Sequence, residues 1–217
     1  MGSSKEGISA LTGPVKASFG HRLRQLQDGK TPLDMKPLPQ FGAGVFELRE
    51  RFDRNAYRLM YVVSLRKALY VLHVFMKKSK SGIGLPKPDA ELIKVRLQSA
   101  RTMDMEDLKM VEKFHKSSGN VFEDIGFTPA EAAELTAKSM LITAIVETID
   151  KRKLTQKEAA HRCRTDQPTL SKVLRGRMES VTIDRLTAWL TALGRTVEIH
   201  VRPYDAKVKT GHLVAAP

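Results

Sequence analysis

The stretch from Gln167 to Arg177 concentrates side chains that can bind nucleic acid. A glutamine amide can bond to both edge groups of adenine, and threonine or serine hydroxyls can contact bases or phosphates. Lysine and arginine side chains in the same stretch can hold phosphate groups. We therefore predict that this stretch contacts double-stranded DNA, together with Gln156 and Thr165, which precede it in the sequence. The predicted set is Gln156, Thr165, Gln167, Thr169, Ser171, Lys172, Arg175 and Arg177.

Two short helices joined by a tight turn are predicted to position these side chains. Thr155 and Glu158 have the spacing of a capping box, which begins the first helix. Asp166 can cap the second helix, and Gly176 is a typical C-terminal stop. Because the apolar residues of the second helix recur on one side, its polar residues face outward, as in a helix-turn-helix that enters the major groove. The alternative is an ordinary helical hairpin with a solvated basic face.

Residues 154–177 and the downstream sequence LTALGRTVEIHVRP resemble XRE/Cro-type repressors, in the branch of HigA-like antitoxins. The resemblance covers residues 117–203 and implies operator DNA with an inverted repeat as the partner. Thr196–Val201 alternates in polarity and predicts a C-terminal strand. Because a lone strand needs a partner, we expect a homodimer formed through the helix-turn-helix domain and this strand.

The composition also indicates a polyanionic partner, because the 217-residue chain has a net charge of +13 and a pI near 9.9. Residues 112–150 are an exception, with 3 basic and 7 acidic side chains. Cys163 is the only cysteine, which excludes an intrachain disulfide and indicates a reducing compartment. No apolar run reaches membrane-spanning length, and no signal-peptide core is present. We expect a cytoplasmic protein without a metal site, a cofactor or a membrane partner.

The elements of the first half predict an α+β domain. Val15–Asp28 has helical spacing, a loop rich in proline and glycine follows it, and Ala90–Arg101 predicts a further helix. Between that loop and the further helix, the patterns of apolar, aromatic and β-branched residues predict three strands. These strands are Val45–Phe52, Tyr57–Leu65 and Leu69–Met76.

The apolar residues of these elements also predict which side chains meet solvent. Phe19, Leu23 and Leu26 recur on one side of the first helix, so the polar residues between them should face away from the core. These polar residues are His21, Arg22, Arg24 and Gln25. The first strand alternates with Phe46, Leu48 and Phe52 toward the core. Its expected solvent face carries Glu47, Arg49 and Arg51.

The sequence motifs of this half are ELR, YRLMYV and YVLHVFMKKSK, followed by the helix over Ala90–Arg101. They resemble the RelE/HigB toxin superfamily, in its phage Gp49-like branch, over residues 3–101. The resemblance implies an antiparallel sheet with packed helices, in a domain that cleaves mRNA on the ribosome without a metal. Domains of this family usually begin with a short strand. The sequence before Ser3-Ser4 does not contain that strand, which favours an inactive toxin.

The resemblance also implies a site. Attack of a ribose 2′-OH on the adjacent phosphate needs a proton acceptor, a proton donor and cations for the developing charge. By analogy the arginines are expected to hold the phosphate, and His73 is expected to transfer a proton because the ordinary pKa of histidine lies near neutrality. The expected catalytic residues are Arg49, Arg58, His73, Lys77 and Lys78, and the expected RNA contacts are Lys80 and Arg51.

Each of these residue types also has a plainer interpretation. A single histidine in an apolar strand is commonly a hydrogen-bonded core residue. The sequence KKSK at the end of the third strand can be a solvated turn, and Arg49 can pair with Glu47 or Asp53.

The chain is therefore predicted to join a toxin to its antitoxin. The predicted segments are a RelE/HigB-like toxin domain at 1–104, a linker at 105–120, a helix-turn-helix antitoxin domain at 121–203 and a basic tail at 204–217. In this interpretation the acidic residues 112–150 contact the basic first half, so that the fused chain restrains a latent ribosome-dependent mRNA endoribonuclease and represses its own operator. The alternatives are a DNA-binding regulator that carries a degenerate toxin domain, and a structural protein that uses the basic first half as a docking surface.

Overall fold

The computed structural model describes residues 4–63, 69–77, 85–105, 117–203 and 213, apart from the side chains of residues 103–105. It divides into two compact units, Met1–Gly126 and Phe127–Pro217. In the described ranges, no helix is both long enough and apolar enough to cross a membrane.

The first unit is built on a four-stranded antiparallel sheet with the strand order β1-β2-β3-β4. Its strands are β1 (Lys36–Pro37), β2 (Val45–Phe52), β3 (Asn55–Val63) and β4 (Leu69–Lys77). The three long strands confirm that the predicted strands exist. β3 begins two residues before the predicted Tyr57, and residues 64 and 65 of that prediction lie outside the described ranges. β1 lies in the segment that the sequence predicted as a loop, and a short 3-10 helix, η1 (Pro39–Phe41), follows it.

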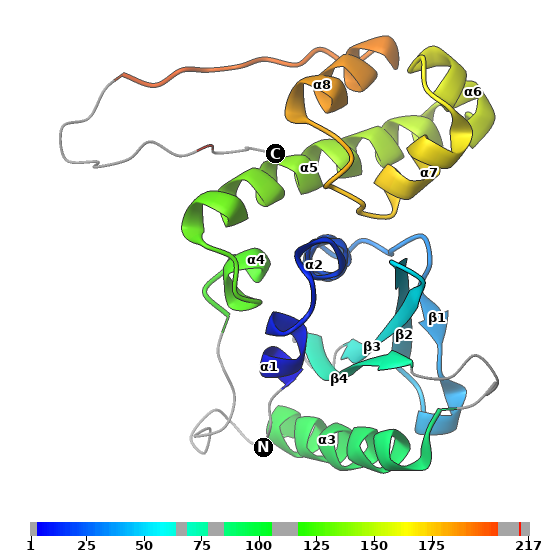
Figure 1. The fold of residues 1–217 in the computed structure, drawn as a ribbon, viewed down its shortest axis with the longest axis vertical. Coiled ribbons are helices and arrows are strands. Elements are labelled where there is room, and N and C mark those ends of the chain that lie inside the picture. Colours follow the sequence, from blue (N-terminus) through cyan, green and yellow to red (C-terminus); the bar gives the residue numbers. More distant parts are fainter. Residues whose placement is uncertain (1–3, 64–68, 78–84, 106–116, 204–212, 214–217) are drawn as a thin grey trace. The chain divides into compact units, whose positions relative to one another are not determined.

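Helices cover both faces of this sheet (Figure 1). α1 (Ser4–Ser9) and α2 (Gly13–Gln27) lie on one side, and α3 (Lys87–Met105) lies on the other. α1 packs on β4, and α2 packs on β2 and β3. On the opposite face, Met60 and Val62 of β3 pack with Ile93 and Leu97 of α3. This arrangement confirms the predicted α+β class.

The polar side chains of α2 do not face solvent, which corrects the prediction for this helix. His21, Arg22 and Gln25 are buried, and Arg24 is half-buried. Burial lowers the pKa of His21 to about 3, with smaller contributions from the charges of Arg22 and Arg24. The imidazole of His21 is therefore neutral at pH 7.

A buried ion network explains how Arg22 is accommodated inside the first unit. Its guanidinium donates hydrogen bonds to Ser18 Oγ at 2.9 Å and to the carboxylate of Glu50. It also donates a hydrogen bond to the carbonyl oxygen of Arg49 at 2.9 Å. These bonds compensate the desolvation of the charge. Because the Arg49 carbonyl belongs to β2, the network ties α2 to the strand that carries part of the predicted site.

A short helix, α4 (Val121–Asp124), also belongs to the first unit. It packs on α2, and Ser9 Oγ donates a hydrogen bond to the carbonyl oxygen of Ile125 at 3.1 Å. The sequence placed this segment at the start of the second domain. The division into compact units falls later, between Gly126 and Phe127.

The second unit is helical, which confirms the all-α prediction for the second domain. Its helices are α5 (Pro129–Lys151), α6 (Gln156–Arg162), α7 (Gln167–Leu174) and α8 (Ile183–Ala192). Leu170 on α7 and Leu186, Trp189 and Leu190 on α8 are buried. α5 packs against α7 and α8, and α6 packs against α7. Since α6 and α7 are short and consecutive, they form the predicted helix-turn-helix.

The C-terminal strand predicted over Thr196–Val201 is absent. Residues 195–203 form neither helix nor strand, and Ile199 and Val201 are 81% and 91% exposed. A strand exists only through hydrogen bonds to a neighbouring strand. Among the described residues of the second unit there is no such neighbour.

Candidate functional sites

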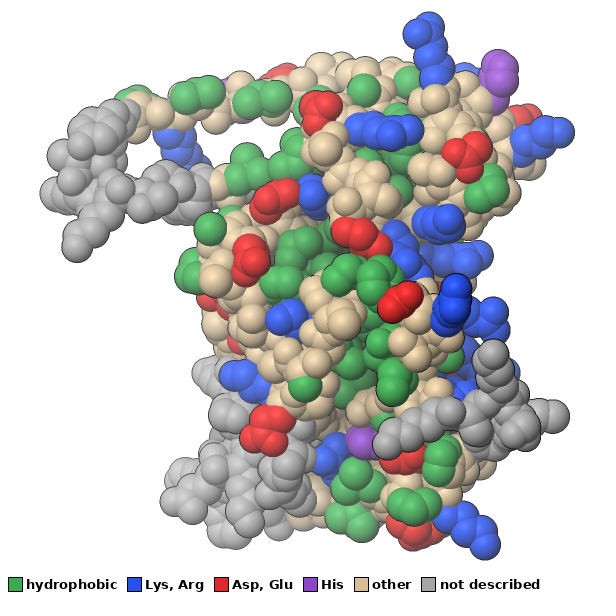
Figure 2. Space-filling view, in the orientation of Figure 1, with side chains coloured by type: hydrophobic (Ala, Val, Ile, Leu, Met, Phe, Trp, Pro, Cys, Tyr) green, Lys and Arg blue, Asp and Glu red, His purple; other side chains and the backbone are tan. Residues whose placement is uncertain are grey.

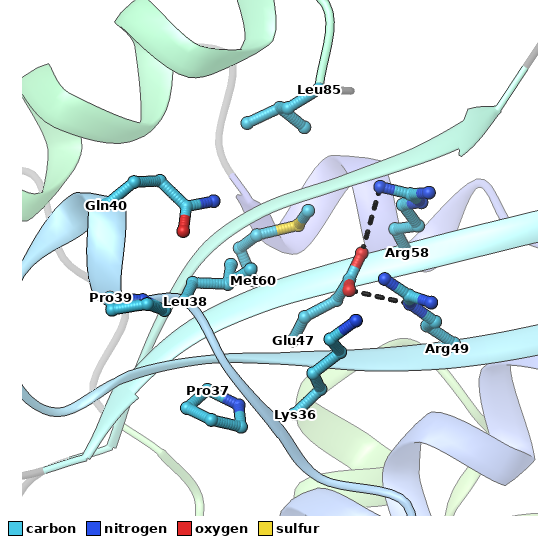
Figure 3. Close-up of a pocket in the computed structure, with 10 residues that line it drawn as sticks. All are labelled: Lys36, Pro37, Leu38, Pro39, Gln40, Glu47, Arg49, Arg58, Met60 and Leu85. Atoms are coloured by element: carbon cyan, nitrogen blue, oxygen red, sulfur yellow. Dashed lines mark hydrogen bonds and ion pairs between the residues drawn. The ribbon is translucent and has the colours of Figure 1, made fainter. Parts of the chain in front are cut away.

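One face of the sheet in the first unit holds a pocket of about 270 Å³ around a buried carboxylate (Figure 3). Glu47 of β2 has 0% of its surface exposed, and its Oε2 accepts a hydrogen bond from Arg49 Nε at 2.6 Å. Arg58 NH1 forms an ion pair with Glu47 Oε1 at 3.2 Å. That oxygen has no hydrogen-bond partner in the described ranges. The carboxylate is therefore held between two cations and retains one oxygen that can accept a further hydrogen bond.

Glu47 is buried because β1 and η1 cover this part of β2. In the register of the two strands, Lys36 of β1 lies opposite Glu47 of β2. The amide of Leu38 donates a hydrogen bond to the Val45 carbonyl oxygen at 2.9 Å. The prediction that Glu47 faces solvent is therefore wrong. The plainer interpretation of Arg49, in which it pairs with Glu47, is confirmed.

The pocket brings together chemical groups that phosphodiester chemistry uses. A carboxylate can accept a proton, and guanidinium groups bind phosphate oxygens in pairs. Arg49 and Arg58 are direct partners in the β2–β3 pairing, so the sheet fixes their spacing. Their side chains are 48% and 13% exposed. Both arginines of the predicted catalytic set therefore line one pocket.

The site predicted from the sequence did not include three polar residues that line this pocket, namely Lys36, Gln40 and Glu47. A signal for Glu47 was available, because it lies two residues before Arg49 and must share its strand face. Lys36 and Gln40 lie in the segment predicted as a loop, and no pattern in that segment indicates where it packs.

His73 does not line the pocket. It lies on β4 opposite Met60, and Met60 is in turn opposite Glu47, so the histidine is one strand further across the sheet. Its Nε2 lies 3.0 Å from Asp89 Oδ1, and its Nδ1 lies 3.4 Å from Arg96 NH1. Both ring nitrogens therefore have polar neighbours, and the ring is held in one orientation. The structure thus separates His73 from the two arginines.

The remaining residues of the predicted RNA site lie on the same sheet face or outside the described ranges. Arg51 follows Arg49 on β2 and is exposed. Lys77 ends β4 opposite Ala56 and is half-buried. Lys78 and Lys80 are not among the described residues. Arg51 and Lys77 therefore extend the basic character of this face beyond the pocket.

The second unit positions the predicted DNA contacts on α6 and α7. Thr155 and Asp166 cap these helices through bonds to the amides of Glu158 and Thr169. Leu170, Val173 and Leu174 bury one side of α7, as the sequence predicted. The opposite side of α7 is therefore turned toward solvent. Its exposed or half-buried residues include Gln167, Thr169, Ser171 and Lys172, and Arg175 follows the helix.

Specific hydrogen bonds orient several of these side chains. Gln167 Nε2 donates to Gln156 Oε1 at 3.1 Å, so the two amides meet across the turn. Thr169 Oγ1 donates to Asp166 Oδ2 at 2.6 Å, so its hydroxyl takes part in the cap. Thr165 Oγ1 is buried and has no hydrogen-bond partner among the residues described. The side-chain amides of Gln156 and Gln167 therefore lie together at the start of α7.

The charged residues around these helices leave a basic surface. Lys172 and Arg175 are exposed, and Arg177 NH1 lies 3.6 Å from Glu179 Oε1. Figure 2 shows further Lys and Arg side chains over α6 and along the margin of the first unit that carries β1 and β2.

On the buried side of α6, burial raises the pKa of the Cys163 thiol to about 11. Cys163 is therefore a neutral thiol at pH 7.

The fold and these sites define a two-domain protein with an α+β domain and a helix-turn-helix domain. Comparison with known families finds the same two kinds of domain in the same order. Residues 6–98 match the family of phage-derived Gp49-like proteins, and residues 121–202 match a helix-turn-helix domain family. The chain therefore joins a Gp49-like, phage-derived domain to a helix-turn-helix domain, as the sequence predicted. No curated protein and no solved structure matches it.

Proposed function

We propose that this protein is a fused type II toxin–antitoxin protein. The first unit is a metal-independent endoribonuclease of the RelE/HigB type that acts on mRNA at the ribosome. The second unit is a HigA-like, XRE-type repressor of its own operator. The observation that carries the nuclease assignment is the buried Glu47 carboxylate held between Arg49 and Arg58. With DNA and mRNA as partners, the protein acts in the cytoplasm.

The proposed cleavage uses the carboxylate as the proton acceptor. Glu47 takes the proton of a ribose 2′-OH, and the 2′-oxygen forms a bond to the adjacent phosphorus. The guanidinium groups of Arg49 and Arg58 bind the phosphate oxygens, where negative charge develops. The bond from phosphorus to the 5′-oxygen breaks, and that oxygen takes a proton from a donor on the same sheet face. We assign this step to Lys77 or to His73, which lies on the same sheet face but would have to leave Asp89 and Arg96 to reach the phosphate.

The proposed repressor reads DNA with α7 in the major groove. The paired amides of Gln156 and Gln167 support this assignment, because they meet at the start of the helix where base edges are read. Ile199 and Val201 are exposed on a segment without secondary structure, and we assign this segment to the dimer contact. A dimer would bind an inverted repeat with half-sites about one helical turn apart.

The alternative is a DNA-binding regulator whose Gp49-like unit is inactive. The position of His73 favours it, because both ring nitrogens lie near other side chains and the ring lies outside the pocket. In this case Glu47, Arg49 and Arg58 form a structural ion network.

A cleavage assay separates the two functions. Residues 1–126, which form one compact unit, are added to a translation reaction, and mRNA ends are mapped by primer extension. We expect cuts in translated mRNA, fewer cuts with Arg58→Ala, and unchanged cutting with Lys94→Ala, an exposed control on α3. A folded 1–126 fragment that leaves translated mRNA intact would exclude the nuclease and leave the regulator. The full chain is tested in parallel for enrichment of an inverted repeat from random duplexes.

A further inference from the structure

The first unit contains a docked segment that precedes the helix-turn-helix. Residues 117–126 include α4, and Val121, Phe122 and Ile125 are 5%, 0% and 4% exposed. A helix of four residues has almost no stability of its own. Asn120 caps it by accepting a hydrogen bond from the amide of Phe122 at 3.0 Å. The contact with α2 must therefore supply most of what holds α4 in place.

The contact has a specific socket on α2. A Cβ atom added at Gly20 would lie 2.7 Å from Phe122 Cε1 and 3.0 Å from Ile125 Cδ1. Glycine weakens the middle of a helix, so its presence at this position needs a packing reason. The close approach of the Phe122 ring to the α2 backbone provides that reason.

Hydrogen bonds complete the edge of the socket. Ser9 Oγ donates to the carbonyl oxygen of Ile125 at 3.1 Å, and Lys16 Nζ donates to that of Gly126 at 3.3 Å. Both carbonyls follow α4, where helix carbonyls lack partners within the helix. The α1–α2 surface thus binds the segment by its apolar side chains and by its backbone.

We infer that residues 117–126 are a docking segment through which the second half of the chain stays bound to the α1–α2 surface when the connector is cut. In sequence the segment overlaps the start of the helix-turn-helix family match at residue 121, whereas in structure it belongs to the Gp49-like unit. The connector, residues 106–116, then raises the effective concentration of the two halves and is not needed to hold them together. Proteolysis there does not release the first half. The inference holds whether or not the first unit cleaves RNA.

The test cuts the full-length protein at an engineered protease site within residues 106–116. After cleavage, size-exclusion chromatography over a dilution series measures the dissociation constant of the two pieces. We expect the wild-type pieces to elute as one complex. Phe122→Ala should weaken the complex about 100-fold or more, because it empties a buried aromatic site. Glu123→Ala, an exposed position on the same helix, is the matched control and should not change the constant.

A second variant tests the other side of the contact. Gly20→Ala adds one methyl group where the Phe122 ring lies, yet alanine favours the helix more than glycine does. It should therefore weaken the complex while α2 stays folded, which circular dichroism of the uncut chain checks. If Phe122→Ala unfolds the protein, Gly20→Ala decides the question. Separation of the wild-type pieces at micromolar concentration would overturn the inference. So would wild-type affinity in the folded Gly20→Ala variant.

Discussion

Replacing Glu47 with glutamine tests the proposed pocket, because the amide keeps the shape of the side chain and removes its charge. Its oxygen can still accept the bond from Arg49 Nε. The Arg49 side chain is 48% exposed, so the loss of its ion pair costs about 0–1 kcal/mol. Arg58 is 13% exposed and loses its opposite charge in a drier environment, which costs about 1–3 kcal/mol. The free energy of unfolding should therefore fall by about 1–4 kcal/mol, the sum of these two ranges.

The same substitution should change RNA cleavage and RNA binding in opposite directions. If Glu47 accepts the 2′-OH proton, cleavage by residues 1–126 should fall about 100-fold or more. Binding to single-stranded RNA should strengthen, because the Glu47 carboxylate no longer competes with phosphate for Arg49 and Arg58. Removing one negative charge from the site should raise the affinity most at low salt, because salt screens charge interactions.

Three measurements check this prediction. They are denaturant unfolding, primer extension on translated mRNA, and fluorescence anisotropy with labelled RNA between low and moderate salt. Glu91→Gln is the control, since it makes the same change at an exposed position on α3. If Glu47→Gln retains full cleavage, the carboxylate is not the proton acceptor. If cleavage falls while RNA affinity at low salt stays unchanged, the arginines do not hold phosphate.

Three further predictions concern the two units. Gln167→Ala should relax base preference, which selection from random DNA measures. Arg175→Ala should weaken binding to all duplexes and reduce the slope of log K against log salt by about 1, which salt titrations measure. Equal effects on all sequences from both variants would contradict the assignment. Because burial holds the pKa of His21 near 3 and an unfolded histidine titrates near 6.5, the unfolded chain binds the extra proton. The first unit should therefore lose stability as pH falls from about 6.5 toward 3, by at most about 1.4 kcal/mol per pH unit, and His21→Phe should flatten this slope in urea titrations. Thr155→Ala removes the capping bond of α6 and should destabilise the second unit by about 1 kcal/mol in thermal unfolding, whereas Thr191→Ala, at an exposed site, should change it little.

The sequence determined the local structure of this protein with few errors. β2 begins and ends where its alternation predicted, and the caps at Thr155 and Asp166 form as their spacing indicated. Both signals are local, because strand alternation and helix capping depend on residues at most a few positions apart. The apolar face of α7 could be predicted for the same reason. The class of each half followed from these elements.

The predicted site was only partly recoverable from the sequence. Arg49 and Arg58 could be placed together because neighbouring antiparallel strands bring their residues into register. Glu47 was assigned to solvent, since nothing near it in the sequence shows that β1 and η1 return to cover it. His73 was assigned to the site because of its residue type, and only the fold reveals its contact with Asp89, 16 residues away.

Tertiary structure alone decided which side chains are buried against distant segments. Arg22 looked like a solvent-facing residue of an amphipathic helix, yet Glu50 and the Arg49 carbonyl provide partners that make its burial tolerable. Phe122 lies about a hundred residues beyond the glycine it packs on, and the distance in sequence hides that contact. A residue's own sequence neighbourhood sets its backbone conformation. Its burial and its electrostatic partners depend on chain segments that only folding brings together.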